Sequence, residues 1–293
     1  MFSDHFQFAS ETKSKQLLNT PDKFTQSWSP FDIQARLMDT SATPDRLFNY
    51  IQDQVLEWTD EEMSYTRDRL EYIGNVIQES KLNIQLPDTI YLVKTTGLEE
   101  GSAVAYTRSN YIVFKSGIAS MDQNQLDHLI LHELFHVLSR LNPDFRKNMY
   151  DIIGFKLMPE LDYPDDIADL RITNPDAPQT DSYIQLKVDG EERAYMMVLY
   201  ASKPYNGTGG FFEYLKVGFL RLKNEANQMK VDPDLKIYSL GEMAGFFDKI
   251  GRNTSYIIHP EEIMAENFAM TILANKTVQD EWILEKVSNL LKS

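Results

Sequence analysis

The sequence predicts an α+β fold, and three features of its hydrophobic pattern support this prediction. Two helix start signals fall within residues 43–85, two later zones are rich in β-branched and aromatic residues, and the C-terminal part returns to helical periodicity. With 293 residues, 42% of them hydrophobic, the chain can bury a sizeable core. We expect an N-terminal arm and helical subdomain over 1–85, and a larger domain over 86–293 with a β-rich insertion at about 159–235.

The N-terminal region is predicted to become helical only after an irregular arm. Residues 1–42 are polar and show no clear period. Thr43-Pro44 predicts a helix start, because Thr is a good N-cap and Pro suits the first helical position. Thr59 and Glu62 have the spacing of a capping box and predict a second helix.

Two zones carry strand signals. The first zone predicts three strands, the last two as a hairpin, at 89–93, 104–106 and 111–114. In the second zone, Asp189-Gly190 lies between two apolar runs and predicts a hairpin turn.

The stretch between these zones, 159–178, is predicted to be an ordered loop. We interpret its acidic residues as solvated, with a calcium site as the alternative; they are Asp162, Asp165, Asp166 and Asp169.

The chain is predicted to end in three helices, at about 240–250, 260–275 and 278–291. Capping-box spacing supports two of the starts, with Ser239 and Glu242 in one and Thr277 and Asp280 in the other.

Composition limits the class of partner and the chemistry. A net charge of -15 repels phosphate backbones, so we expect no nucleic-acid partner. The absence of cysteine excludes disulfides, thiolate ligands and a cysteine nucleophile. No apolar run approaches the roughly 20 residues that span a bilayer, and the first residues do not resemble a signal peptide. We expect a cytoplasmic protein, or a secreted one if a leader has been removed.

One predicted helix carries the motif His-Glu-Leu-Phe-His. It has Asp122 as N-cap, ends near Asn142 and is apolar at helical spacing in between. His132 and His136 are four residues apart, so their Cβ atoms lie about 5–6 Å apart on one face and both rings can reach one zinc ion. Glu133 can stand beside the metal without binding it, as a general base for metal-activated water requires.

His128 continues the same spacing, but three histidines over two turns cannot share one ion. We interpret His128 as a surface residue, with a hydrogen bond to a metal-site residue as the alternative.

The third protein ligand is predicted to be a carboxylate from a distant helix. A catalytic zinc usually has three protein ligands, cysteine is absent, and Asn142 stands where an extended motif would place a third His. Glu262 and Glu266 share one face of the helix predicted to begin at Pro260. We expect Glu262 to bind the metal and Glu266 to accept a hydrogen bond from a ligating histidine, with Glu261 and Glu266 as the next candidates for the ligand.

These motifs together resemble the gluzincin branch of zinc metallopeptidases, a branch of the zincin fold. The resemblance rests on His132-Glu133-x-x-His136 and on Glu262-x-x-x-Glu266, where the family often has Asp in the last place. It implies a zincin-like mixed sheet packed on the motif helix, Glu133 as general base and Glu262 as third ligand. It also implies an edge strand that binds substrate backbone, which we place at 102–108.

The sequence thus predicts a zinc-dependent metallopeptidase that acts on a peptide or protein. Tyr256 and His259 are the candidates for the group that stabilises the oxyanion. The main alternative is an inactive zinc-binding scaffold that binds a partner through its aromatic-rich region; this region contains Tyr205, Phe211, Phe212 and Tyr214. A hydrolase acting on a non-peptide bond and a binding protein without metal are further alternatives. The oligomeric state is not predicted.

Overall fold

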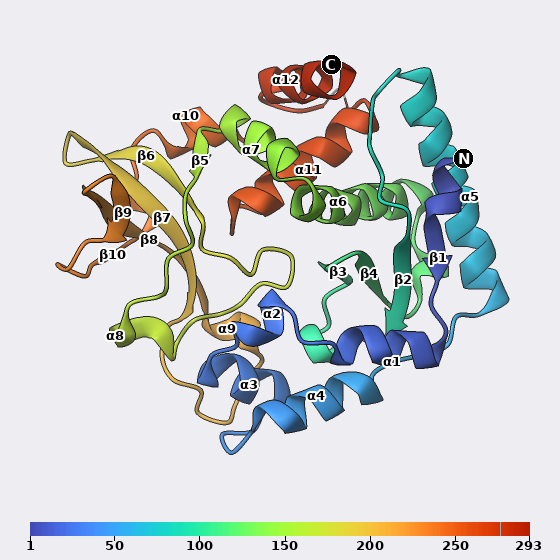
Figure 1. The fold of residues 1–293 in the computed structure, drawn as a ribbon, viewed down its shortest axis with the longest axis horizontal. Helices are drawn as coiled ribbons and strands as arrows, with labels where there is room; N and C mark the ends of the chain where they lie inside the picture. The colour runs from blue at the N-terminus through green and yellow to red at the C-terminus, as the bar shows by residue number, and fades with distance from the viewer. Residues whose placement is uncertain (276) are drawn as a thin grey trace.

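The computed structural model describes residues 1–275 and 277–293. It has an α+β fold, which confirms the predicted class, with a four-stranded sheet and a six-stranded sheet among helices. In Figure 1 the two sheets lie on opposite sides of the molecule, with α6, α7, α11 and α12 above and α1, α3 and α4 below. No helix in the described ranges is both long and apolar enough to cross a membrane.

The four-stranded sheet has the order β1-β2-β4-β3. Its strands are β1 (Phe6–Phe8), β2 (Ile90–Thr95), β3 (Ala105–Arg108) and β4 (Tyr111–Lys115). β1, β2 and β4 are parallel, whereas β3 pairs antiparallel with β4, which confirms the predicted hairpin. Ser109 has a φ of 46° in the turn. β3 is therefore an edge strand, at the place where the sequence analysis puts a substrate-binding edge.

The prediction that residues 1–42 are irregular is wrong. They form β1 and three helices, which are α1 (Glu11–Asn19), α2 (Lys23–Gln26) and α3 (Pro30–Leu37). Each helix has a side-chain cap, from Ser10, Asp22 and Ser29. Elements of four to nine residues are too short to show a hydrophobic period, so only their caps signal them in the sequence.

The six-stranded sheet has the order β10-β8-β7-β6-β5, with β9 paired to β8. Its strands are β5 (Phe155–Leu157), β6 (Ser182–Val188), β7 (Glu191–Ala201), β8 (Leu215–Glu225), β9 (Gln228–Val231) and β10 (Ile237–Tyr238). The predicted β6/β7 hairpin is confirmed, and Asp189 and Gly190 both have positive φ in its turn. The sheet begins before and ends after the expected insertion at 159–235, while the division into two domains stays a prediction.

The loop between β5 and β6 holds one short helix, α8 (Asp165–Ala168), and a second, α9 (Phe211–Tyr214), precedes β8. The four acidic side chains of the loop are exposed. Among the described residues, none of these four belongs to a group that could hold a metal ion.

The remaining helices largely follow the sequence expectations. They are α4 (Pro44–Asp53), α5 (Asp60–Glu79), α6 (Gln123–Leu141), α7 (Pro143–Ile152), α10 (Phe246–Ile250), α11 (Pro260–Ile272) and α12 (Glu281–Lys292). The helix predicted at 240–250 is interrupted, because Gly245 has a φ of 84° between a 3-10 turn and α10. The start predicted at Thr277 is wrong, since α12 begins after Asp280, which is its N-cap.

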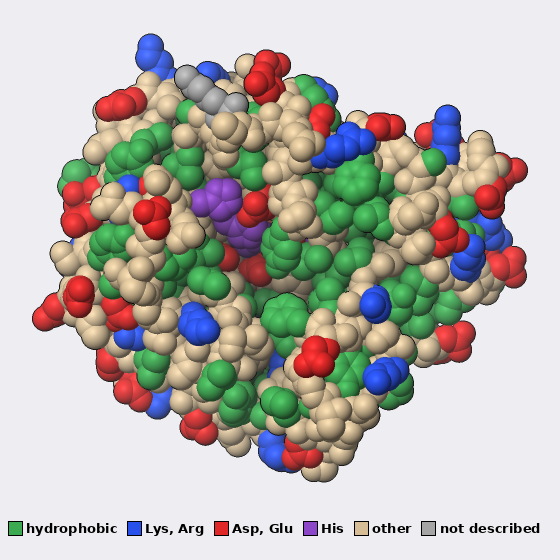
Figure 2. All heavy atoms as spheres, turned by 180° about the vertical axis from the view of Figure 1, so that it is seen from behind, with side chains coloured by type: hydrophobic (Ala, Val, Ile, Leu, Met, Phe, Trp, Pro, Cys, Tyr) green, Lys and Arg blue, Asp and Glu red, His purple; other side chains and the backbone are tan. Residues whose placement is uncertain are grey.

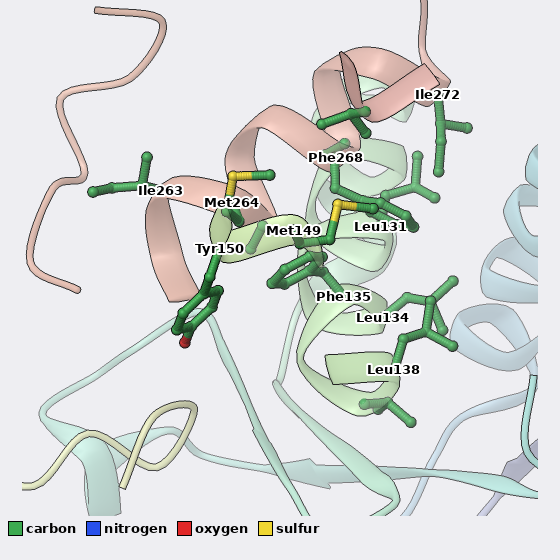
Figure 3. Packing of buried hydrophobic residues seen from close by; sticks show 14 of the residues in the cluster. Leu131, Leu134, Phe135, Leu138, Met149, Tyr150, Ile263, Met264, Phe268 and Ile272 are labelled. Carbon is green, nitrogen blue, oxygen red and sulfur yellow. The ribbon is translucent and has the colours of Figure 1, made fainter. Parts of the chain in front are cut away.

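Packing between α6, α7 and α11 fixes the two helices that carry the candidate site. Figure 3 shows Phe135 from α6 near Met149 from α7 and Phe268 from α11. All three side chains are fully buried, and the rings of Phe135 and Phe268 lie 5.6 Å apart. Because close-packed interiors resist small displacements, this contact holds the two helices at a set distance.

A buried acid beside β3 gives the fold a pH-dependent stability. Glu99 accepts hydrogen bonds from Thr95 and Tyr106 at one oxygen, while its other oxygen has no partner. Burial raises the pKa of Glu99 from 4.5 to about 6. A raised pKa in the folded state means that the contribution to stability is complete below about pH 4.5 and is lost as the pH rises through about 6.

We therefore expect Glu99→Gln to stabilise the protein at neutral pH relative to acid pH. The difference in unfolding free energy between variant and wild type should grow by about 2 kcal/mol from pH 4.5 to neutral pH. Urea unfolding at both pH values measures it, with Glu71→Gln on the exposed surface as the control. Equal differences at both pH values would contradict the prediction.

Candidate metal centre

The candidate site lies where α6 and α11 face each other. Helical spacing puts His132 and His136 on one face of α6, and that face is turned toward the first turn of α11. His259 caps α11 by accepting the backbone N–H of Glu261 at 3.1 Å. Glu262, in the first turn, therefore comes opposite the two histidines.

Three buried side chains meet at one point. Glu262 Oε2 lies 3.0 Å from His132 Nε2 and 3.4 Å from His136 Nε2, and all three residues are buried. His136 Nε2 is buried and has no hydrogen-bond partner. Ligands at about 2.0–2.1 Å in a tetrahedral site are about 3.3 Å apart, so the donors have the separation of ligands around one ion. The geometry and donor set fit a metal ion.

The outer nitrogen of each histidine is held by a carboxylate. His132 Nδ1 lies 2.9 Å from Glu266 Oε1, the kind of contact expected for Glu266. His136 Nδ1 lies 3.2 Å from Glu261 Oε1, a contact that the sequence analysis missed because it considered Glu261 only as a ligand. Such carboxylates fix the ring orientation and tautomer of metal-binding histidines.

Glu261 is itself fixed by hydroxyl groups. Its carboxylate accepts hydrogen bonds from Ser139 and, at 2.7 Å, from Tyr150. The Glu261 carboxylate is therefore turned away from the point where His132, His136 and Glu262 meet. His128 lies on the rim, partly exposed, with Nε2 3.1 Å from Glu266 Oε1, so it contacts a residue of the site and belongs to a second, overlapping group of His128, His132 and Glu266.

The histidines and glutamates of the site stabilise each other's charged forms. Burial lowers the pKa of His132, but its hydrogen bonds to Glu262 and Glu266 raise it to about 9. Burial raises the pKa of Glu262, yet the nearby His136 and His132 hold it well below its usual range. Glu262 and Glu266 thus stabilise a positive charge on His132.

The Glu133 side chain contacts β3 and lies close to His136. Its carboxylate accepts a hydrogen bond of 2.7 Å from the Thr107 hydroxyl on β3. Burial raises its pKa despite the nearby histidines. It lies with His136 and Asp176 in a third group that could hold a metal ion, with facing atoms within 4.8 Å of one another. Glu133 is therefore beside the ligand cluster without belonging to it.

A loop segment before β6 supplies two site residues that the sequence analysis missed. Asn174 Nδ2 donates to Glu262 Oε1 at 2.6 Å, and Asp176 Oδ1 accepts the backbone N–H of Thr107 at 2.5 Å. Asn and Asp are common in loops, and no local pattern marks these two. Only the tertiary fold brings them to the site.

A buried ion network anchors this segment. Arg36 pairs with Asp32 at 2.6 Å and with Glu100 at 2.8 Å, and all three side chains are almost fully buried. Arg36 also donates to the carbonyl of Thr173, whose backbone N–H donates to Asp32. Arg140 on α6 donates to the backbone carbonyl of Asp176 at 2.9 Å. The Arg36 network and Arg140 therefore hold the loop segment at 173–176 from two different helices.

The site opens into a cleft of about 730 Å³. Figure 2 shows histidine and acidic side chains in a hollow bordered by hydrophobic surface. Three exposed apolar side chains, Val104, Phe212 and Tyr256, line the cleft together with His132 and Glu133. Its wall is mainly hydrophobic and its floor carries the charged groups.

The two candidates for oxyanion stabilisation have different surroundings. The Tyr256 ring lies 6.1 Å from that of His132 and lines the cleft, and the negative charge of Glu262 raises its pKa. His259 is buried as the cap of α11 and does not line the cleft; burial lowers its pKa to about 4.

The fold and the site define an α+β protein with a buried His/Glu cluster that could hold a metal ion. Residues 95–143, which include the whole motif of α6, match the family model described as eCIS core domain. This match covers about a sixth of the chain. Comparisons with curated proteins and with solved structures found no match.

Proposed function

We propose that this protein is a zinc-dependent hydrolase that cleaves peptide bonds. The observation that carries the proposal is the meeting of His132, His136 and Glu262, with an unpartnered buried Nε2 on His136. Two imidazoles and one carboxylate are a known ligand set of catalytic zinc, and carboxylates on the outer nitrogens are typical of such sites. A bound zinc ion supplies Lewis acidity, which polarises a carbonyl group and lowers the pKa of water.

Glu133 is proposed as the general base. It lines the cleft beside the histidines, and its hydrogen bond from Thr107 holds the carboxylate in place. In this role it takes a proton from the attacking water and delivers it to the leaving amine. Tyr256 is proposed to donate a hydrogen bond to the oxyanion, because it faces the cleft whereas His259 caps a helix.

The alternative of an inactive scaffold is less well supported. The aromatic region assigned to partner binding is mostly core, since Tyr205, Phe211 and Tyr214 are at most 7% exposed. Only Phe212 is exposed, and it lines the same cleft as Glu133. A scaffold has no use for a buried carboxylate beside its metal ligands. The same residues would permit hydrolysis of a non-peptide bond.

Metal-dependent peptide cleavage tests the proposal. We expect purified protein to cleave members of a mixed peptide library, to lose this activity after dialysis against a chelator, and to regain it with added zinc. Mass spectrometry of the products identifies the bonds that are cut. A fully metal-loaded protein that cuts no peptide would overturn the proposal and favour the scaffold.

Removing the carboxylate behind His132 should weaken metal binding without removing a ligand. We expect Glu266→Ala to lower zinc affinity by about 10- to 100-fold, because His132 loses the group that orients it. Competition with a fluorescent zinc chelator measures the affinity. Glu71→Ala, on the exposed face of α5, is the control. Unchanged affinity in Glu266→Ala would show that Glu266 does not orient the histidine.

A further inference from the structure

The loop segment that reaches the site also covers part of the edge strand. Thr107 of β3 donates its backbone N–H to Asp176, and its carbonyl accepts from Arg140 at 3.5 Å. In Figure 1 the loop after α8 reaches toward β3. Both outward-facing backbone groups of Thr107 are therefore occupied, and an added strand cannot pair with the edge at this position.

The other half of the edge remains open. Backbone groups alternate in direction along a strand, so those of Ala105 face the same edge as those of Thr107. Ala103, Val104 and Ala105 line the cleft, whereas Thr107 does not. An extended chain can pair with the edge at Ala105 and must end before Thr107. The cleft is therefore closed at one end.

The closed end carries two neighbouring carboxyl groups. Asp176 lines the cleft with Glu133, and their carboxylates lie close together. Asp176 faces Glu133 and His136, with the facing atoms of the three side chains within 4.8 Å of one another, and Arg140 donates only to its backbone carbonyl. Burial and the nearby Glu133 raise the pKa of Asp176, so a cation bound beside the two carboxyl groups relieves their repulsion, whereas a terminal carboxylate adds to it.

We propose that the closed end binds a primary ammonium group of the substrate, so that the protein removes residues from the amino terminus of peptides. This inference rests on the proposed function and specifies its substrate class. Asp176 accepts a hydrogen bond from the ammonium group, and the first residue of the peptide pairs with Ala105. A chain that continues beyond this residue collides with the segment at 174–176.

Matched peptides test the inference on the zinc-loaded, full-length protein. One apolar sequence is prepared in three forms: with a free amino terminus, N-acetylated, and N-acetylated with lysine as the first residue. Products are identified by mass spectrometry and kcat/KM is measured for each form. We expect the free form to lose its first residue, and acetylation to lower kcat/KM by about 10- to 100-fold, the factor that a charged hydrogen bond contributes.

The lysine peptide separates the two sources of an ammonium group. Cleavage of that form as fast as of the free form would show that a side-chain amine replaces the terminal one, and would overturn the assignment to the amino terminus. Equal cleavage of free and acetylated peptides, or cuts at internal bonds, would overturn the inference and leave the proposed hydrolase intact. If no form is cut by the zinc-loaded protein, the proposed function fails and the inference with it.

Asp176→Asn tests the residue itself. Asparagine keeps an oxygen that accepts the Thr107 N–H, so the segment should stay in place. We expect the ratio of kcat/KM between free and acetylated peptides to fall toward one. Asp166→Asn on the exposed α8 is the matched control and should keep the wild-type ratio. A wild-type ratio in Asp176→Asn would overturn the assignment.

Discussion

Replacing Glu133 with glutamine is expected to abolish most turnover while metal remains bound. Glutamine preserves the size of the side chain and its contact with Thr107, but it cannot accept a proton from water. We expect kcat/KM to fall by about 100- to 10,000-fold, the usual contribution of a general base. Metal content and cleavage rate should be measured on the same preparation.

The control for this variant is Glu71→Gln, the same change on the exposed surface of α5. It should leave both the rate and the metal content unaltered. Full activity in Glu133→Gln would contradict the proposed base. Loss of the metal together with the activity would show instead that Glu133 is needed to build the site.

Replacing Arg36 with methionine is expected to produce the largest loss of stability. Methionine leaves Asp32 and Glu100 buried, close together and without their cation. Breaking a buried ion pair by removing one partner costs about 3–5 kcal/mol. Urea unfolding followed by tryptophan fluorescence should show this decrease in unfolding free energy.

Arg193→Met is the matched control, because Arg193 pairs with Glu191 on the surface, where half or more of each side chain is exposed. Exposed pairs contribute about 0–1 kcal/mol, so this change should be small. A similar loss in both variants would contradict the assignment of Arg36 as the buried anchor of the segment at 173–176.

The sequence predicts best the parts of the site that depend on local structure. The limits of α6 follow from its cap at Asp122 and its apolar spacing, and the structure confirms them. The start of α11 follows from Pro260, and this start brings Glu262 and Glu266 to one face. Because helical geometry is regular, residue spacing alone indicates which of these side chains can meet.

Residues from irregular segments could not be predicted in the same way. Asn174 and Asp176 reach the site through a loop, and Arg36 anchors that loop from a helix far away in the sequence. Neither a period nor a motif encodes such contacts, which depend on how the two sheets are placed. The partner of His136 was missed because Glu261 and Glu262 look equivalent in the sequence, while the helix turns them to different nitrogens.

The most direct test of the account is the metal content of purified protein, measured by mass spectrometry for wild type beside Glu262→Ala. The protein should be prepared without added metal or chelating resin. The account predicts close to one zinc ion per chain in wild type and much less in the variant, because Glu262 is the donor that joins the two histidines. No bound metal in wild type, and none taken up from added zinc, would contradict the central claim.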